Sequence, residues 1–166
     1  MKNKVIVIIA LVCLGISAAQ AQKIGFLNTN DLLVLMPEVK SADSVLVKYA
    51  SDMQEIYYGY VLEYQKKLDD YNKNSSTWSE VKIESAEKDL QDAQQRINDY
   101  ERESNDKLAA KKEELYGPIL ADVKAKIKLV GEENKLTAIL DGSALLYFGT
   151  DAIDILPMMK KKMGLM

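Results

Sequence analysis

The side chains that could perform chemistry are few in this sequence, and the usual reagents of enzyme catalysis are missing. It contains no histidine and a single cysteine, Cys13. Catalytic triads and the common zinc sites therefore have no residues from which to be built. Neither a G-x-G-x-x-G motif nor a phosphate-binding loop occurs. These features argue against an enzyme, and we expect no metal and no cofactor.

Adjacent charged residues are the remaining candidates for acid and base chemistry. Lys111-Lys112-Glu113-Glu114 and Asp69-Asp70 are the densest groups. Neighbouring residues on a helix do not share a face, so we interpret both groups as solvated surface. A catalytic carboxylate pair would also need an enclosed pocket, which the two paired helices predicted below do not offer. The sequence favours a binding or structural protein.

The N-terminus predicts export. Lys2 and Lys4 precede the apolar run 5–16, which ends in Ser17-Ala18-Ala19-Gln20-Ala21. This order is typical of a secretory signal peptide, and the run is shorter than the roughly 20 residues that a membrane-spanning helix needs. An uncleaved anchor and a lipid-modified Cys13 are the alternatives. We expect residues 1–21 to be a signal peptide that is cut after Ala21.

The mature chain is acidic and rich in residues that favour helices. Without Lys2 and Lys4 it keeps 20 basic and 25 acidic residues, a net charge of minus 5. That balance opposes nonspecific binding to nucleic acid. Lys, Glu, Asp, Gln, Ala and Leu dominate the composition, which leans to long helices.

Two long helices that pack along each other are predicted, the first beginning near Glu38 and the second continuing to about residue 115 or beyond. Apolar residues recur at steps of three and four along 46–71 and again, more regularly, along 83–104. Such a stripe is the seam of a helix that packs on a partner helix. The first seam comprises Leu46, Tyr49, Met53, Tyr57, Val61, Tyr64, Leu68 and Tyr71, and the second comprises Ile83, Ala86, Leu90, Ala93, Ile97, Tyr100 and Ser104.

The segment between the two seams is predicted to be the tip of a hairpin. Residues 72–77 all prefer turns and caps to helix interiors, and Thr77 or Ser79 can cap the second helix. Gly117-Pro118 predicts a kink or joint near the end of that helix. Helices of about 35 residues each reach about 50 Å, too long for a compact domain of this size. We therefore expect them to project from a base.

The base is predicted to contain short strands. Residues 23–28 read as one strand, followed by a helix from Asp31 to Met36, and 135–140 and 143–148 read as a hairpin about the turn Asp141-Gly142. A last short helix has Pro157 near its start. Three short strands bury too little surface to be stable alone, so we expect oligomerisation through this base. The residues assigned to this oligomerisation body are Ile24, Phe26, Ile139, Leu145 and Tyr147.

The order of these elements resembles the Skp/OmpH family of periplasmic chaperones. The likeness is carried by Lys23-Ile24-Gly25-Phe26-Leu27-Asn28, Tyr116-Gly117-Pro118-Ile119, Ala138-Ile139-Leu140-Asp141 and Asp154-Ile155-Leu156-Pro157. It implies a mainly α fold with a small β base, in which a long antiparallel coiled-coil hairpin arm (46–115) projects from a strand-based oligomerisation body (22–45 and 116–166).

The resemblance also implies a function. Members of this family are trimers whose arms enclose unfolded outer-membrane proteins in the periplasm and deliver them for insertion, so the expected partners are such proteins, further copies of the chain and the insertion machinery. The implied activity is that of a holdase that needs no ATP. A structural or adaptor coiled-coil protein of the envelope is the alternative.

This chain departs from the family in two respects. Residues 61–90 carry a net charge of minus 2, whereas better-known members have basic arms, so contact with clients would be mainly apolar. Leu156 stands where the family commonly has a hydroxyl residue, and Asp154 is expected to cap the last helix instead.

Tyrosines on a seam most commonly serve packing between the helices, whereas Tyr58 and Tyr60 are predicted to lie off the seam. The residues assigned to client contact are Met53, Tyr58, Tyr60, Val61 and Trp78.

Overall fold

The computed structural model describes residues 23–165, so the predicted signal peptide, its cleavage point and Cys13 lie outside the described residues. The chain divides into two compact units. We call residues 36–122 the arm unit, and residues 23–35 with 123–165 the body unit. The arm unit is longer than the predicted arm, 46–115, because helical pairing continues at its base, where the Tyr116 hydroxyl donates a hydrogen bond to Asp43.

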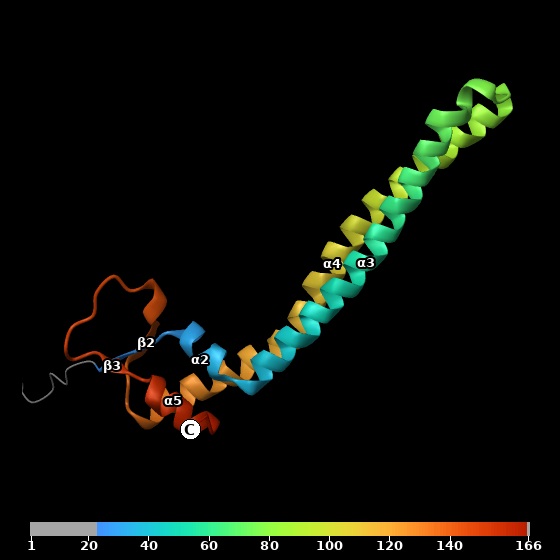
Figure 1. Ribbon diagram of the computed structural model, residues 1–166. Helices are drawn as coiled ribbons and strands as arrows, with labels where there is room; N and C mark the ends of the chain where they lie inside the picture. The colour runs from blue at the N-terminus through green and yellow to red at the C-terminus, as the bar shows by residue number, and fades with distance from the viewer. Residues whose placement is uncertain (1–22, 166) are drawn as a thin grey trace, which may run out of the picture. The chain divides into compact units, whose positions relative to one another are not determined.

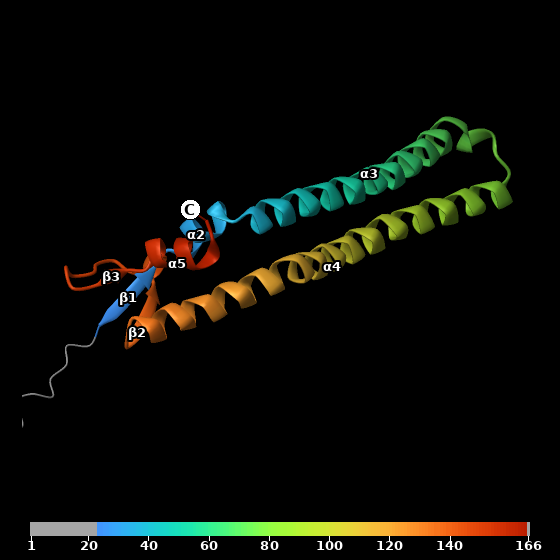
Figure 2. The ribbon, with the colours of Figure 1, turned by 90° about the horizontal axis from the view of Figure 1, so that it is seen from below.

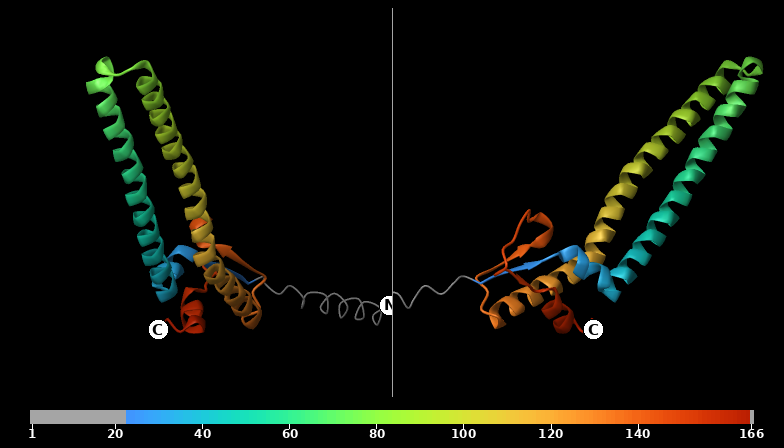
Figure 3. Two further views of the ribbon diagram at one scale, coloured as in Figure 1. Left: turned by 90° about the vertical axis from the view of Figure 1, so that its right-hand side faces the viewer. Right: turned by 60° about the vertical axis from the view of Figure 1, so that its left-hand side comes forward.

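Two long helices form the arm unit. Helix α3 (Pro37–Asn74) is followed by a short 3-10 turn, η2 (Ser75–Thr77), and then by α4 (Glu80–Glu133), whose last turns belong to the body unit. Figures 1 and 3 show α3 and α4 side by side over the length of the arm. Met36 is extended and Pro37 occupies the first turn of α3, where its missing N–H costs nothing. The tip thus falls in the predicted segment.

The helices run antiparallel in a constant register. Contacts between them join Tyr71 to Glu87, Glu63 to Arg96, and Asp43 to Tyr116, so residue numbers fall on α3 as they rise on α4. All seven predicted seam positions of α4 are buried or half-buried, and every other residue from 81 to 104 is exposed. The predicted seam is confirmed, and Ala93 and Ile97 are its best-buried members at 3% and 6% exposure.

Helix α4 continues through Gly117-Pro118 without a break. Pro118 removes one backbone hydrogen bond, and the carbonyl that loses its donor belongs to Glu114, an exposed residue that water can reach. The expected joint is therefore not a helix end. The division between the two units falls just beyond it, between Asp122 and Val123, inside the same helix.

A three-stranded sheet forms the centre of the body unit, in the order β2-β1-β3 (Figure 2). Strand β1 (Ile24–Leu27) pairs in parallel with β2 (Ala138–Asp141) on one side and with β3 (Ile153–Asp154) on the other. Parallel neighbours need a long crossover connection, and the whole helical hairpin supplies the one between β1 and β2.

The predicted strand hairpin at 135–148 is wrong. Residues 142–144 form a 3-10 turn, η3, and residues 145–152 form no strand. Asp141 directs the chain into this turn because its carboxylate accepts hydrogen bonds from the Ser143 amide (2.9 Å) and hydroxyl (2.8 Å). Gly142 does not have the positive φ that a tight hairpin turn requires. Its lack of a side chain has another use: a Cβ there would lie 3.3 Å from the backbone nitrogen of Asn28.

Two short helices complete the body unit. Helix α2 (Thr29–Leu35) begins two residues before the predicted Asp31 because the Asn28 side chain accepts the amide of Asn30 (3.1 Å). Helix α5 (Leu156–Met163) begins just after Asp154, whose carboxylate accepts the Leu156 amide (2.9 Å) and so supports the helix start as expected. Gly164 ends α5 with a positive φ of 69°. The core of this unit comprises Leu27, Leu32, Val123, Val130, Ile155 and Met159, each 2% exposed or less.

Candidate functional site

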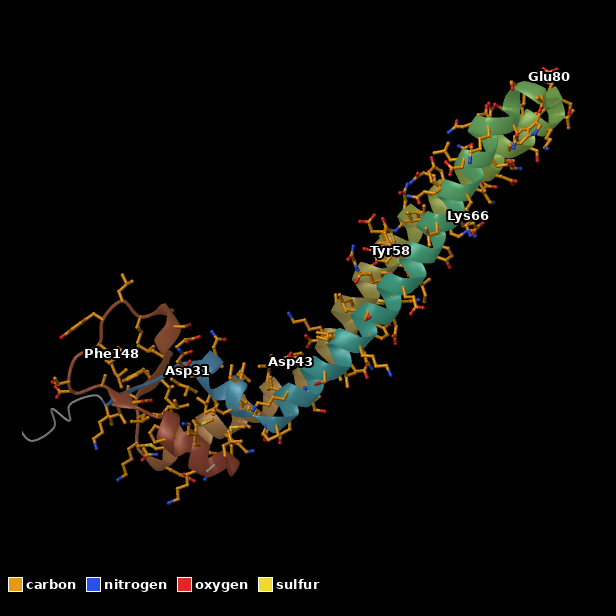
Figure 4. The ribbon with its side chains drawn as sticks, viewed as in Figure 1. Asp31, Asp43, Tyr58, Lys66, Glu80 and Phe148 are labelled. Atoms are coloured by element: carbon orange, nitrogen blue, oxygen red, sulfur yellow. The ribbon has the colours of Figure 1, made fainter. Side chains whose placement is uncertain are left out.

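The arm tyrosines divide into packed and exposed residues. Tyr57, Tyr64 and Tyr71 lie on the seam and are half-buried, as predicted. Tyr58 is 54% exposed and lies about midway along α3 (Figure 4). Its hydroxyl accepts a hydrogen bond from Gln54 within the same helix (3.3 Å). Tyr58 is therefore the tyrosine of the arm that offers a broad surface to a partner.

Tyr60 does not lie off the seam as predicted. Its ring meets that of Tyr100 edge to face with 5.2 Å between centroids, and the guanidinium of Arg96 lies 5.7 Å from its centre. Both partners belong to α4. An edge-to-face aromatic pair is stabilising, so this ring serves helix pairing. Counting residues along one stripe missed it because two helices that interlock bury a band wider than a single row.

Trp78 closes the tip of the hairpin. The indole meets the ring of Tyr71 edge to face at 6.1 Å, and the Lys82 ammonium lies 4.2 Å from its centre. Tyr71 in turn donates a hydrogen bond to Glu87 (2.6 Å), a bond that raises the pKa of the Tyr71 hydroxyl. Trp78 is half-buried and contacts a residue of each helix, so its main role is to hold the two helices together at the tip.

Trp78→Ala should loosen the tip and little else. An aromatic pair contributes about 0.5–1.5 kcal/mol beyond its buried area, so amide exchange should accelerate at residues 72–83 and stay unchanged at Ala93 and Ile97. Hydrogen exchange read by mass spectrometry measures this. Val81→Ala is the control, because that side chain is 76% exposed. Equal acceleration in both variants would show that Trp78 does not hold the tip.

The remaining two arm candidates, Met53 and Val61, are half-buried. Met53 contributes its carbonyl to a hydrogen bond from the Tyr100 hydroxyl (3.3 Å). It also lines a hollow of about 410 Å³ between the helices. Ser104 contributes a buried hydroxyl to the same hollow, and this oxygen has no hydrogen-bond partner. Only part of each of the Met53 and Val61 side chains is thus accessible to a partner.

An apolar groove lies on one face of the body sheet. Ile24 and Phe26 of β1 and Leu140 of β2 form its floor, and it encloses about 260 Å³. Phe148, labelled in Figure 4, stacks on Phe26 with 4.2 Å between ring centroids. The groove brings together four of the five residues assigned to the oligomerisation body: Ile24, Phe26, Leu145 and Tyr147.

Ile139, the fifth, lies on the opposite face. A Cβ on Gly25 would lie 3.3 Å from its side chain, and one on Gly131 would lie 3.1 Å from it. Sequence reasoning overlooked three large residues near the groove, all exposed: Leu140 (42%), Leu146 (105%) and Phe148 (50%). Exposed apolar area of this kind is typical of surfaces that bind a protein, a ligand or a membrane.

The two units differ in charge. The arm unit has 12 basic and 19 acidic residues, a net charge of minus 7, while the body unit has 8 basic and 6 acidic residues, a net charge of plus 2. Several arm charges pair with each other, as Glu63 does with Arg96 (3.1 Å) and Lys67 (3.3 Å). An acidic arm does not attract acidic partners over long range.

Within residues 23–165, no cluster of three or more potential metal ligands is found. In the same part of the chain, no helix combines the length and apolar character required to cross a membrane.

Comparison with known proteins identifies the class. A family model described as outer membrane protein (OmpH-like) matches residues 23–163, so the chain belongs to the OmpH-like, or Skp/OmpH, family. Its fold matches the crystal structure of an OmpH-like protein of Caulobacter crescentus, provisionally described as an outer membrane chaperone. That match has a TM-score of 0.69 at 12% identity and covers 90% of this chain and 88% of the other. No curated protein sequence matches significantly.

Proposed function

We propose that the protein is an ATP-independent holdase chaperone of the periplasm, which binds unfolded outer-membrane proteins and keeps them from aggregating before insertion. The observation that carries the proposal is the surface of α3, where Tyr58 and Leu62 are more than half exposed although the seam is complete without them. A structural spacer has no need of such residues, whereas a binder of unfolded chains does. Family membership and the related structure, described as a chaperone, support the same role.

The proposed mechanism is passive. Many weak apolar contacts lower the concentration of free aggregation-prone segments, and release follows when the client folds. No nucleotide, metal or catalytic residue takes part. We propose export by the signal peptide at 1–21 and assembly as a homotrimer through the body groove, because its exposed apolar residues are those that a neighbouring copy would cover.

The test is aggregation of a denatured outer-membrane β-barrel protein on dilution, followed by light scattering while the mature chain is titrated in and its oligomer mass is recorded. Suppression that saturates near one trimer per client supports the proposal. A well-folded oligomer that leaves scattering unchanged would identify a structural or adaptor protein of the envelope instead.

Tyr58→Ser should weaken client holding several-fold without changing helicity. Its ring is more than half exposed and its hydrogen bond stays within one helix, so folding loses little while a client loses an apolar face. Binding of a fluorescent client measures the effect, and circular dichroism checks the fold. Tyr60→Ser is the comparison, because it breaks the contact with Tyr100 and should lower arm stability. Unchanged holding in Tyr58→Ser would remove this residue from the contact surface.

A further inference from the structure

A second row of side chains runs along α3, apart from the seam. Its members follow one another at steps of four, three, four, four and three residues, which places them on one side of the helix. All six are exposed and none is charged, although Lys48, Asp52, Glu55 and Glu63 occupy other positions of the same stretch. We call this set the uncharged row: Val47, Ser51, Gln54, Tyr58, Leu62 and Gln65.

The row has the chemistry of a surface for polypeptide. Val47 (70%), Tyr58 (54%) and Leu62 (55%) offer exposed apolar area. The amides of Gln54 and Gln65 and the hydroxyl of Ser51 both donate and accept hydrogen bonds, as a peptide backbone requires. Within an arm of net charge minus 7, an uncharged row lets an uncharged segment be covered without stripping water from an ion.

Gly59 is an independent sign that this surface is kept open. It stands inside α3, where glycine costs about 1 kcal/mol relative to alanine. A Cβ at this position would meet no atom within 4 Å, so neither packing nor a positive φ requires glycine. Tyr58, Gly59 and Leu62 line an open hollow of about 550 Å³ together with Ser51, Gln54 and Glu55. The missing side chain leaves room for an occupant.

The length of the row suggests the occupant. The last member lies eighteen positions along the helix from the first, about 27 Å at 1.5 Å per residue. An extended chain covers that distance with about eight residues at 3.3 Å each, close to the length of a membrane-spanning β-strand. We propose that the uncharged row holds one extended, strand-length segment of an unfolded client, with alternate apolar side chains facing α3. This inference rests on the proposed function and names the part of a client that the arm takes.

Single cysteines test the placement, because residues 22–166 contain none. Ser51→Cys and Gln65→Cys on the row, and Ser85→Cys and Gln95→Cys at exposed sites of α4, are each labelled with a benzophenone probe. After irradiation with denatured β-barrel client, the row sites should give several-fold more client cross-links, concentrated in segments of alternating apolar residues. Equal yields at row and control sites overturn the inference. Row cross-links between copies of this chain without client would overturn it too, and would assign the row to self-association.

Two substitution pairs test the energetics. Val47→Ser with Leu62→Ser should weaken client binding by about tenfold, whereas Val45→Ser with Ile56→Ser should leave it within about twofold. The control pair removes a valine and a branched aliphatic residue that are also exposed, at 44% and 48%. If both pairs weakened client binding equally, and the unmodified chain still suppressed aggregation, the inference would be overturned. Failure of that suppression would instead reject the proposed function.

Gly59→Gln tests whether the glycine matters for the space that it leaves for a client or only for the stability of the helix. Glutamine favours helix over glycine, so thermal stability of the arm should rise. Its side chain would enter the open hollow, so client binding should fall several-fold. A purely structural role for this position predicts a more stable arm with unchanged binding, and that result would count against an occupied hollow.

Discussion

Ile155→Ala should lower the free energy of unfolding by about 2–5 kcal/mol, the usual cost of truncating a buried isoleucine to alanine. Ile155 is 0% exposed, and its amide donates a hydrogen bond to the carbonyl of Phe26 (3.0 Å). It packs where Gly25 leaves space, since a Cβ on that glycine would lie 3.0 Å from it. The substitution therefore opens a cavity under the centre of the sheet.

Urea denaturation at a fixed protein concentration measures the loss, and Ile56→Ala provides the matched control. Ile56 is 48% exposed, so its truncation should change stability by about 0.5 kcal/mol or less. A loss in Ile155→Ala as small as that of the control would mean that the body unit is not held by this core. Hydrogen exchange should show the new openings in the body unit and not at the arm tip.

Ile97→Asp should cause a larger loss of helix than Ile155→Ala. Ile97 is 6% exposed on the seam of α4, one turn from buried Ala93. A carboxylate at this place would lose most of its hydration, and burying a charge costs several kcal/mol unless it is paired. Because the seam holds the two helices together along this part of the hairpin, pairing should fail from Ile97 toward the tip. Circular dichroism at 222 nm on heating measures the change.

Gln95→Asp introduces the same charge two residues away on the exposed side of α4. It should shift the thermal midpoint little, because exposed substitutions change stability by about 0.5 kcal/mol or less. If both variants melted alike, the net charge of the arm rather than burial at Ile97 would explain the loss.

The helices of the arm could be predicted because one physical cause sets both their sequence and their structure. A residue that is buried once per turn repeats every three or four positions, and Ile83 to Ser104 obey that period throughout. The sheet could not be predicted in the same way. Asp141-Gly142 carries the signal of a tight hairpin, yet this aspartate caps a 3-10 turn and a Cβ on the glycine would lie only 3.3 Å from the backbone nitrogen of Asn28. Long-range contact of that kind leaves no local pattern.

The surface that we propose for client contact overlaps only in part with the residues assigned to it from the sequence. Tyr58 was recognised by its position off the seam, but Tyr60 was misplaced because its ring reaches across to Tyr100. Val47 and Leu62 were not assigned from the sequence, because the proposed uncharged row mixes apolar and polar members. Its regularity lies in the absence of charge, which a count of apolar residues does not detect.

The pairing of residue 24 with residue 138 has a consequence for the order of folding. The two strands are joined by the whole arm, and an open loop of that length closes slowly, because many conformations must be lost before any contact is gained. Contacts between neighbouring turns at the tip have no such handicap. We therefore expect the helical hairpin to form from residues 75–77 toward its open end. This brings the segments around residues 24 and 138 together before the sheet forms, so the body unit folds last.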